Sequence, residues 1–351
     1  MTTTHHSFHP SRLPRCAAGA LALALAVAGC SATAGGDEGD AERHVFAEAE
    51  PGAFPVTVEH ALGSTTIEEQ PERVVVIGWA GADLAVALGT VPVAQGVAAG
   101  IDADHYPWFA EAVEELGGVL PAVDPSLERG EVDIEYVLEQ DPDLVLAIGS
   151  GISEVEYERL SEIAPTVAYP DGPWETTVPE HLALMGEALG RSDRAAEIVE
   201  EMDERLAASA AAHPELDGLS FLNASIPAED GSVVVFSSAD QRTHTLEALG
   251  LEPLPQAEAL LAANDGASSF VLGLEELREL APDVFVTVAT DDAWQAALDA
   301  QPVFASWAPV ADGRAAPIAD PAVGLAFSTA TPLALSWGLD EIVEELLDAT
   351  D

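Results

Sequence analysis

The chain has 351 residues, and 48% of them are hydrophobic, which is enough apolar material for a sizeable core and favours two domains. Its 62 acidic residues face only 12 basic residues, giving a formal net charge of −50. A charge of this sign and size repels phosphate backbones. Nucleic acid is therefore excluded as a partner.

Residues 1–29 have the layout of a secretory signal. The first fifteen residues carry histidine and arginine but no acid, and the short apolar run CAAGALALALAVAG follows them. A membrane-spanning helix needs about twenty apolar residues, so this run is too short to cross a bilayer. We expect the chain to be exported and this segment to be removed.

The apolar run ends at Cys30, and a polar, small-residue tract follows it, SATAGGDEGDAER. The ending VAGC resembles the lipobox of bacterial lipoproteins, in which the signal is cut before the cysteine and its sulfur carries a diacylglyceryl group. Cys16 would leave with the signal, so neither a disulfide nor a thiolate metal site is expected. The resemblance implies a lipid anchor on the outer face of the cytoplasmic membrane, with residues 30–53 as a flexible tether. The alternative is an ordinary soluble secreted protein.

Short apolar runs that alternate with helical segments begin near Phe54 and predict an α/β fold with parallel sheets. The runs in the first half are residues 73–77, 91–95, 144–148 and 166–169. The same alternation restarts after Pro214, with LSFLNA, VVVF and VFVTV. We expect two Rossmann-like lobes, residues 54–190 and 214–351.

Residues 191–213 lie between the two halves and predict one long helix. The segment SDRAAEIVEEMDERLAASAAA places its apolar residues on one stripe, with Ser192 as the expected N-cap and His213-Pro214 as the stop. At about 1.5 Å per residue such a helix is roughly 30 Å long, the width of a small domain. We expect this single helix to join the lobes.

A family resemblance begins with the stretch FPVTVEHALGSTTIEEQPERVVVIGWAGADLAVALGTVPVA. It resembles the opening of the iron-siderophore substrate-binding proteins of bacterial ABC importers, a helical-backbone class shared with cobalamin- and haem-binding relatives. Further blocks follow in the family's order and extend the resemblance to nearly everything from residue 54 onward: HYPWFAEAVEELGG, IEYVLEQDPDLVLAIGSGIS, YERLSEIAPTVAYPDGPW, LGRSDRAAEIVEEM and TPLALSWGLDEIVEELL.

The resemblance implies a monomeric extracytoplasmic binding protein that captures a ferric siderophore between its lobes and delivers it to an ABC permease dimer. Alternatives within the class are haem and cobalamin binding. Alternatives outside the class are an anchored sensor domain and a surface hydrolase.

Enzyme signatures are missing from the sequence. No GxGxxG follows the first predicted strand, and no GxSxG elbow or Ser/His/Asp arrangement can be nominated. The acidic pairs lie on helical runs, where a solvated face explains them. We expect a protein that is not an enzyme and that carries no cofactor.

Six histidines remain after removal of the signal, and none stands at the close spacing of a preformed metal site. The sequence therefore predicts no direct metal ligation. His105 beside Tyr106 could offer a haem axial ligand. The alternative for His105 is a polar loop residue next to an aromatic of the cleft.

Ligands of open α/β sheets bind beyond the carboxyl ends of the strands, and the residues expected there are rich in aromatics. Flat side chains and an arginine fork suit the metal chelate and the amide-rich arms of a ferric siderophore. The expected ligand-binding residues are Trp79, Tyr106, Trp108, Ser150, Trp174, Phe236 and Arg242.

By resemblance, Arg242 stands where relatives carry an arginine that can contact the chelate. Two departures accompany it, because relatives often show a proline where Gln241 stands and an aromatic where Gly149 stands. The small residue at position 149 predicts a roomier cleft near Ser150.

Two phrases in the chain are near repeats, QDPDLVLAIG around Pro142 and LAPDVFVTVA around Pro282. Glu135 precedes the first proline by the same seven residues as Glu275 precedes the second. By resemblance, one exposed glutamate on each lobe docks onto arginines of the two permease subunits, and these positions match Glu135 and Glu275. The alternative is that both are ordinary solvated helix acids.

Overall fold

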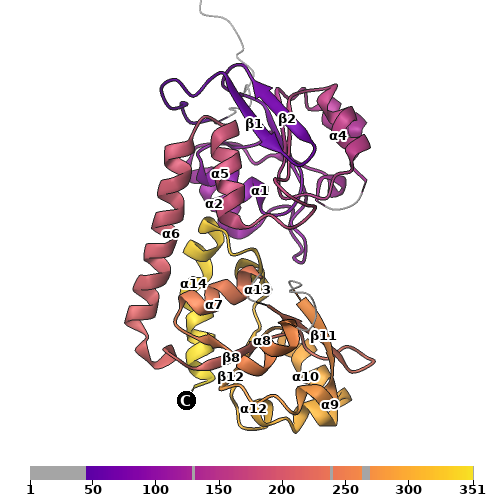
Figure 1. The fold of residues 1–351 in the computed structure, drawn as a ribbon, viewed down its shortest axis with the longest axis vertical. Coiled ribbons are helices and arrows are strands. Elements are labelled where there is room, and N and C mark those ends of the chain that lie inside the picture. The colour runs from indigo at the N-terminus through magenta and orange to yellow at the C-terminus, as the bar shows by residue number, and fades with distance from the viewer. Residues whose placement is uncertain (1–44, 129–130, 238–239, 263–268, 351) are drawn as a thin grey trace, which may run out of the picture. The chain divides into compact units, whose positions relative to one another are not determined.

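The structure is a computed structural model that describes residues 45–128, 131–237, 240–262 and 269–350. The expected signal segment and the expected lipidation site at Cys30 lie outside the described residues. Residues 42–351 form one compact unit, which contains two sheets of parallel strands with helices around them (Figure 1). The α/β class and the two lobes predicted from the sequence are confirmed.

The first lobe contains a five-stranded parallel sheet of order β5-β4-β3-β6-β7, with an antiparallel hairpin, β1-β2, beside it. The four predicted strands of this half each contain an observed strand. The strands are β1 (Val56–His60), β2 (Gly63–Ile67), β3 (Val74–Val76), β4 (Ala94–Gln95), β5 (Ala122–Val123), β6 (Leu144–Ala147) and β7 (Thr166–Ala168). The helices are α1 (Gly81–Ala87), α2 (Pro107–Glu115), α3 (Ile134–Glu139), α4 (Glu154–Ser161) and α5 (Val178–Ala188), with a 3₁₀ turn, η1 (Pro125–Leu127).

The second lobe repeats this arrangement with a four-stranded parallel sheet of order β10-β8-β12-β13. The strands are β8 (Ser220–Asn223), β9 (Ser232–Phe236), β10 (Glu252–Pro253), β11 (Ser269–Gly273), β12 (Val284–Val288) and β13 (Ala315–Ile318). The helices are α7 (Gln241–Ala248), α8 (Pro255–Ala262), α9 (Leu274–Leu277), α10 (Asp291–Ala300), α11 (Pro302–Ala305), α12 (Ala308–Ala311), α13 (Pro321–Thr329) and α14 (Pro332–Asp348), with a 3₁₀ turn, η2 (Pro214–Leu216), before β8.

The run VVVF was expected in the parallel sheet, and that expectation is wrong. It forms β9, which pairs antiparallel with β11 in a separate two-stranded ribbon. Only Val233 and Val235 of this run are fully buried, whereas Val234 and Phe236 are half-exposed. Alternating burial is typical of an antiparallel pair with one wet face, because a central parallel strand is covered on both faces.

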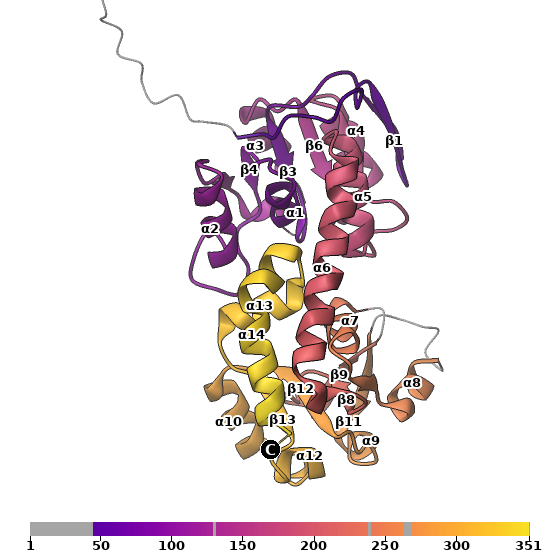
Figure 2. The same ribbon diagram turned by 90° about the vertical axis from the view of Figure 1, so that its left-hand side faces the viewer.

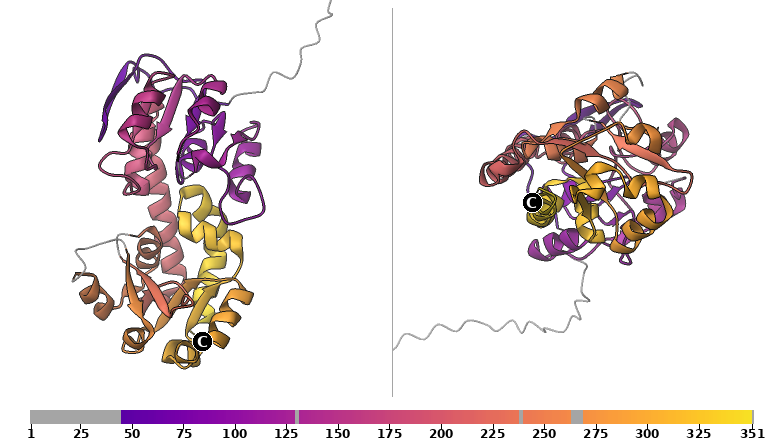
Figure 3. Two further views of the ribbon diagram at one scale, coloured as in Figure 1. Left: turned by 90° about the vertical axis from the view of Figure 1, so that its right-hand side faces the viewer. Right: turned by 90° about the horizontal axis from the view of Figure 1, so that it is seen from below.

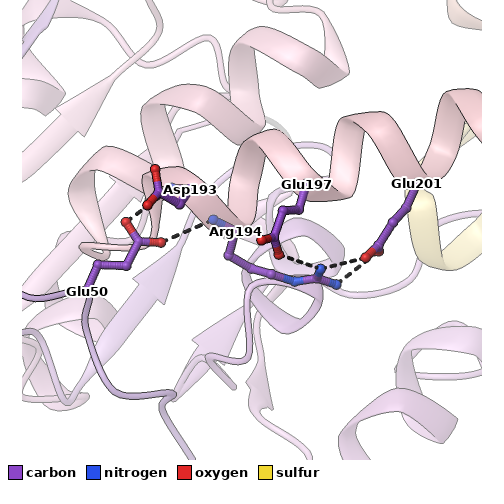
Figure 4. A network of polar contacts seen from close by, with 5 residues as sticks. All are labelled: Glu50, Asp193, Arg194, Glu197 and Glu201. Carbon is purple, nitrogen blue, oxygen red and sulfur yellow. Dashed lines mark hydrogen bonds and ion pairs between the residues drawn. The ribbon is translucent and has the colours of Figure 1, made fainter.

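The long helix α6 (Ser192–Ala212) lies between the two lobes in the chain and runs alongside both of them (Figures 1 and 2). Its predicted stop at His213 is confirmed, since His213 is the C-cap. The predicted N-cap is wrong, because Ser192 is the first helical residue and Arg191 occupies the cap without a side-chain hydrogen bond. The carboxylate of Glu50 instead accepts the backbone N–H groups of Asp193 and Arg194, at 3.1 Å each (Figure 4).

A continuous apolar core connects the lobes along α6. The buried stripe of this helix packs into one cluster with side chains from both parallel sheets and from α14. The stripe consists of Ala195, Ile198, Met202 and Leu206. Further contacts join the lobes, because Trp108 of α2 packs with Ala326 of α13 and Ala334 of α14 in a second cluster. Figure 3 shows α13 lying between the lobes and α14 running from there along the second lobe to the C-terminus.

The Pro-Asp repeats have a structural role in both lobes. The Asp143 carboxylate accepts the backbone N–H groups of Glu72 and Arg73, at 2.7 and 2.8 Å, just before β3. The Asp283 carboxylate accepts the backbone N–H and the hydroxyl of Ser220, at 2.9 and 2.6 Å, at the start of β8. Each aspartate therefore fixes the amino end of the neighbouring parallel strand.

Candidate ligand-binding cleft

A pocket of about 400 Å³ opens between the two lobes, at the carboxyl ends of the strands. One wall comes from the first lobe, from the loops after β3, β6 and β7 and from α5. The other wall comes from α7 and α13 of the second lobe. The lining residues are Trp79, Ala80, Gly149, Trp174, Thr176, Val178, His181, Gln241, Ser328 and Thr329.

Trp79 reaches the pocket because the loop after β3 turns sharply. Gly78 and Ala80, on either side of it, have φ values of 100° and 63°, in the left-handed region. The backbone N–H of Trp79 donates to the carbonyl of Gly149 at 2.9 Å, which ties the loop after β3 to the loop after β6. Trp79 therefore lies on a tightly turned loop that is tied to its neighbour, at the carboxyl end of the strand where the sequence predicted it.

The expectation of a roomier cleft near Ser150 stays a prediction, but the structure gives a reason for glycine at position 149. A methyl group at Gly149 would meet the carbonyl of Trp79 and would approach Cε1 of His181 to 2.8 Å. Trp174 fills the neighbouring space in the same way, since a methyl group at Gly151 would overlap its indole nitrogen. Glycine stands at these positions because backbone and side-chain atoms of other segments occupy the space that a Cβ would need.

Trp174 is the exposed part of the first wall. Its backbone φ is 64°, in the region that non-glycine residues rarely adopt, and its N–H donates to the carbonyl of Ser150 at 3.1 Å. Although it lines the pocket, 52% of the residue remains exposed to solvent. A flat indole surface is thus presented at the mouth of the pocket, as the sequence predicted.

His181 is a lining residue that the sequence analysis missed. It lies on α5 within a buried stripe that also contains Val178, Leu182 and Met185, and this single polar residue on an apolar face was the available signal. Its Nε2 atom is buried and has no hydrogen-bond partner among the described residues. Burial lowers the pKa of His181 from 6.5 to about 3, so the imidazole is neutral at physiological pH.

The second wall is small and polar, and Gln241, Ser328 and Thr329 form it. The expected ligand residues Phe236 and Arg242 are not among the described residues that line the pocket. The Arg242 guanidinium carbon stands 3.5 Å from the centre of the Phe236 ring. Its Nε and Nη2 atoms donate to the carboxylate of Asp240 at 2.8 and 2.7 Å, in a bidentate ion pair.

Three further predicted ligand residues lie elsewhere. Trp108 is only 2% exposed, and its indole N–H donates to Oδ2 of Asp83 at 2.6 Å, so it is part of the core. Ser150 is 1% exposed, and its hydroxyl donates to the carbonyl of Ala147 at 2.6 Å. Tyr106 stacks on Trp108 with ring centres 4.7 Å apart and borders a smaller adjoining cavity. The position of a residue after a strand therefore did not reveal whether its side chain packs in the core or lines the pocket.

Asp83 connects the lobes beside the pocket. Its Oδ2 atom accepts hydrogen bonds from Trp108 of α2 and from the Thr331 hydroxyl at the start of α14, at 2.6 and 2.8 Å. Burial raises the pKa of Asp83 to about 6, although the two hydrogen bonds oppose the shift. The contact joins α1 of the first lobe to α14 of the second.

The sequence pattern of the periplasmic binding protein family matches residues 74–315 of the chain. This match runs from β3 of the first sheet through α6 to the start of β13 in the second sheet. The chain belongs to this family.

Curated relatives of this periplasmic binding protein are named for siderophore or iron-complex binding. The chain is 32% identical over 154 residues to a probable siderophore-binding lipoprotein, YfiY, of Bacillus subtilis. The aligned part covers 43% of each of the two chains. It is 28% identical over 243 residues to the Fe(3+) dicitrate-binding periplasmic protein FecB of Escherichia coli, and this alignment covers 66% of this chain and 70% of the relative. For the first of these, the matched part spans less than half of the relative's length.

A solved structure with a similar fold is PiaA of Streptococcus pneumoniae in complex with ferrichrome. The TM-score is 0.73 at 29% sequence identity, with 84% of this chain and 98% of that chain covered. A periplasmic solute-binding protein of Mycobacterium smegmatis superposes with a TM-score of 0.72 at 27% identity, with 84% of this chain and 99% of that chain covered.

The two glutamates of the repeated phrases occupy equivalent places in this periplasmic binding protein. Glu135 lies in the first turn of α3, which leads into β6, and Glu275 lies in the first turn of α9, which leads into β12. Both are exposed. Glu275 has Arg278 3.5 Å away, whereas no ion pair joins Glu135 to a basic side chain among the described residues.

Two further observations concern metals and membranes. Among residues 45–128, 131–237, 240–262 and 269–350, no group of three or more His, Cys, Asp or Glu side chains could hold a metal ion. Within the same ranges, every helix is too short or too polar to cross a bilayer.

Proposed function

We propose that the protein captures a ferric siderophore in the pocket between its lobes. The observation that carries the proposal is the pocket itself, which places two indole surfaces, Trp79 and Trp174, opposite a small polar wall. Flat rings pack against the arms of a chelate, while the side-chain amide of Gln241 offers hydrogen bonds to its amide and carbonyl groups. The Thr329 hydroxyl donates to the carbonyl of Leu325, and its oxygen can accept a further hydrogen bond from a ligand amide. The ferrichrome in the PiaA complex and the names of the curated relatives support the same ligand class.

Haem is a weaker candidate for this pocket. The residue that could have been an axial ligand, His105, stacks on Phe109 with ring centres 5.7 Å apart, and its Nε2 lies 3.1 Å from the carbonyl oxygen of Pro121. It does not line the pocket. This arrangement supports the role of a structural loop residue for His105.

The test is a titration of the purified mature protein with ferric hydroxamates, ferric catecholates, haem and cobalamin, followed by tryptophan fluorescence. Trp79 and Trp174 line the pocket, so an iron chelate bound there should quench their emission. Saturable quenching by at least one ferric siderophore is the expected result. Quenching by haem or cobalamin alone, or by none of the compounds, would contradict the proposal.

We further propose that Glu135 and Glu275 dock the loaded protein onto the two subunits of an ABC permease. Their exposure and their equivalent positions in the two lobes support this role. Exposed charges at such places steer encounter and fix register more than they add affinity.

Attachment through a lipid on Cys30 belongs to the same proposal. The tether that follows Cys30 offers no apolar substitute for the acyl chains. Cys30→Ala should therefore release the protein or leave it unprocessed. A correctly processed variant that stays on the membrane would show that the anchor is not the cysteine.

A further inference from the structure

We propose that the pocket selects a ferric chelate without net charge, of the tris-hydroxamate type, and rejects anionic ferric catecholates and carboxylates. This inference rests on the proposed capture of a ferric siderophore and concerns the chemical class of that ligand. Its basis is the distribution of charge around the pocket.

The described lining of the pocket contains no charged side chain. Its polar groups are the indoles, the amide of Gln241 and three hydroxyls, and the one titratable residue is His181. His181 is neutral because burial lowers its pKa to about 3. An anion that entered this pocket would lose its hydration without meeting a counter-charge.

The arginine that follows a lining residue in the chain is already paired with a carboxylate. Arg242 follows the lining residue Gln241 in the chain, but two of its nitrogens bind the two carboxylate oxygens of Asp240. Both side chains are largely buried, with 21% and 18% exposed, so the ion pair is held in place by its surroundings. The pair presents almost no net charge to a ligand.

The adjoining cavity makes the electrostatic environment more negative. A small cavity of about 30 Å³ shares Ala80 and Thr329 with the pocket and is lined by the carboxyl groups of Asp83 and Glu128. No basic residue lines it among the described residues. The chain as a whole carries a formal charge of −50, which slows the approach of anions at low ionic strength.

These features separate siderophore classes by charge. Three singly deprotonated hydroxamates balance a ferric ion, so the chelate is neutral. Three doubly deprotonated catecholates leave three negative charges, and citrate-type carboxylates also leave an anion. Only the hydroxamate class can enter the pocket without an unpaired charge.

The first experiment compares three ferric complexes on the wild-type protein by calorimetry, at low and at physiological salt. The probes are a neutral cyclic tris-hydroxamate, a tris-catecholate and citrate. We expect the hydroxamate to bind at least 100-fold more tightly than either anion at both salt concentrations. Equal or tighter binding of the catecholate or citrate complex would overturn the charge inference but leave siderophore capture standing. Binding of no ferric complex would overturn the proposed function itself.

The second experiment changes the local charge. Asp240→Asn keeps an N-capping oxygen for α7 and leaves Arg242 without its carboxylate, so the ratio of hydroxamate to catecholate affinity should fall about tenfold. Gln241→Arg adds a cation to the second wall and should also lower the ratio of hydroxamate to catecholate affinity.

The matched control is Glu279→Gln, which removes one negative charge from an exposed site before the amino end of β12, whereas the pocket lies at the carboxyl ends of the strands. It should leave the ratio unchanged. If the control and Asp240→Asn shift the ratio equally, total charge controls selection and the local argument is wrong.

Discussion

The two lobes have the same framework and different cleft walls. Four strands of the first sheet, β4-β3-β6-β7, have the same connectivity as the four strands of the second, β10-β8-β12-β13, and the first sheet adds β5 at its edge. Each sheet also has an aspartate that anchors a neighbouring strand. The first wall carries Trp79, Trp174 and His181, whereas the second carries only small polar side chains. The residues before the strands are thus constrained by their role in holding the sheet together. The loops after the strands determine which ligand the cleft can bind.

The lobes also differ at the proposed docking glutamates. The double variant Glu135→Ala with Glu275→Ala should abolish iron uptake by cells while siderophore binding and thermal unfolding stay unchanged. Each single variant should be intermediate, with the larger loss for Glu135→Ala, because Arg278 already attracts Glu275. Glu139→Ala, on the same helix as Glu135, is the matched control. Normal uptake by the double variant would leave the repeated phrases with a structural role only.

The contrast between the cleft walls predicts unequal losses of affinity. Trp79→Ala and Trp174→Ala should each weaken binding of the preferred ferric chelate by about 2–3 kcal/mol, since aromatic anchors dominate binding energy. Gln241→Ala should cost about 1 kcal/mol, the scale of one neutral hydrogen bond. Calorimetry is the suitable measurement, because two of the variants lose a fluorophore. Equal losses on both walls would remove the proposed asymmetry.

Two buried titratable groups in the first lobe should shape stability against pH in opposite directions. Because His181 has a depressed pKa of about 3, its unfolded form takes up a proton that the folded form refuses, and stability is lost as pH falls from about 6.5. Asp83 has a pKa raised to about 6, so protonation favours the folded state and stability is gained as pH falls below 6.

Chemical unfolding at pH 7 and pH 5 separates these contributions. His181→Gln should lose less stability between the two pH values than the wild type loses. Asp83→Asn should lose more, because the opposing carboxyl group is gone. Parallel pH profiles for all three proteins would show that neither group titrates differently in the folded state.

The two strand-anchoring aspartates should give nearly equal effects. Asp143→Ala and Asp283→Ala each remove hydrogen bonds to an exposed strand start, and each should lower the free energy of unfolding by about 1–2 kcal/mol. Denaturant titration measures both values. A difference of more than about 2 kcal/mol would show that the two repeats do not have equivalent structural roles.

The framework was determined by local sequence patterns. Apolar runs such as 144–148 predicted β6, and the stripe from Ala195 to Leu206 predicted the buried face of α6. These signals are local because a strand or a helix face is specified by the spacing of its own residues. Trp79 and Trp174 were found by the same logic, since both lie in loops that follow strands.

Tertiary structure alone decided the remaining features, because they depend on groups that are distant in the chain. Glu50 caps α6 in place of the expected Ser192, and Arg242 is withdrawn from the pocket by Asp240 and Phe236. Trp108 is buried because Asp83 accepts its N–H while α13 and α14 pack beside it. His181 reaches the pocket wall because Gly149 leaves space for its ring. A sequence specifies which side chains are available, but the packing of distant segments decides which of them face the ligand.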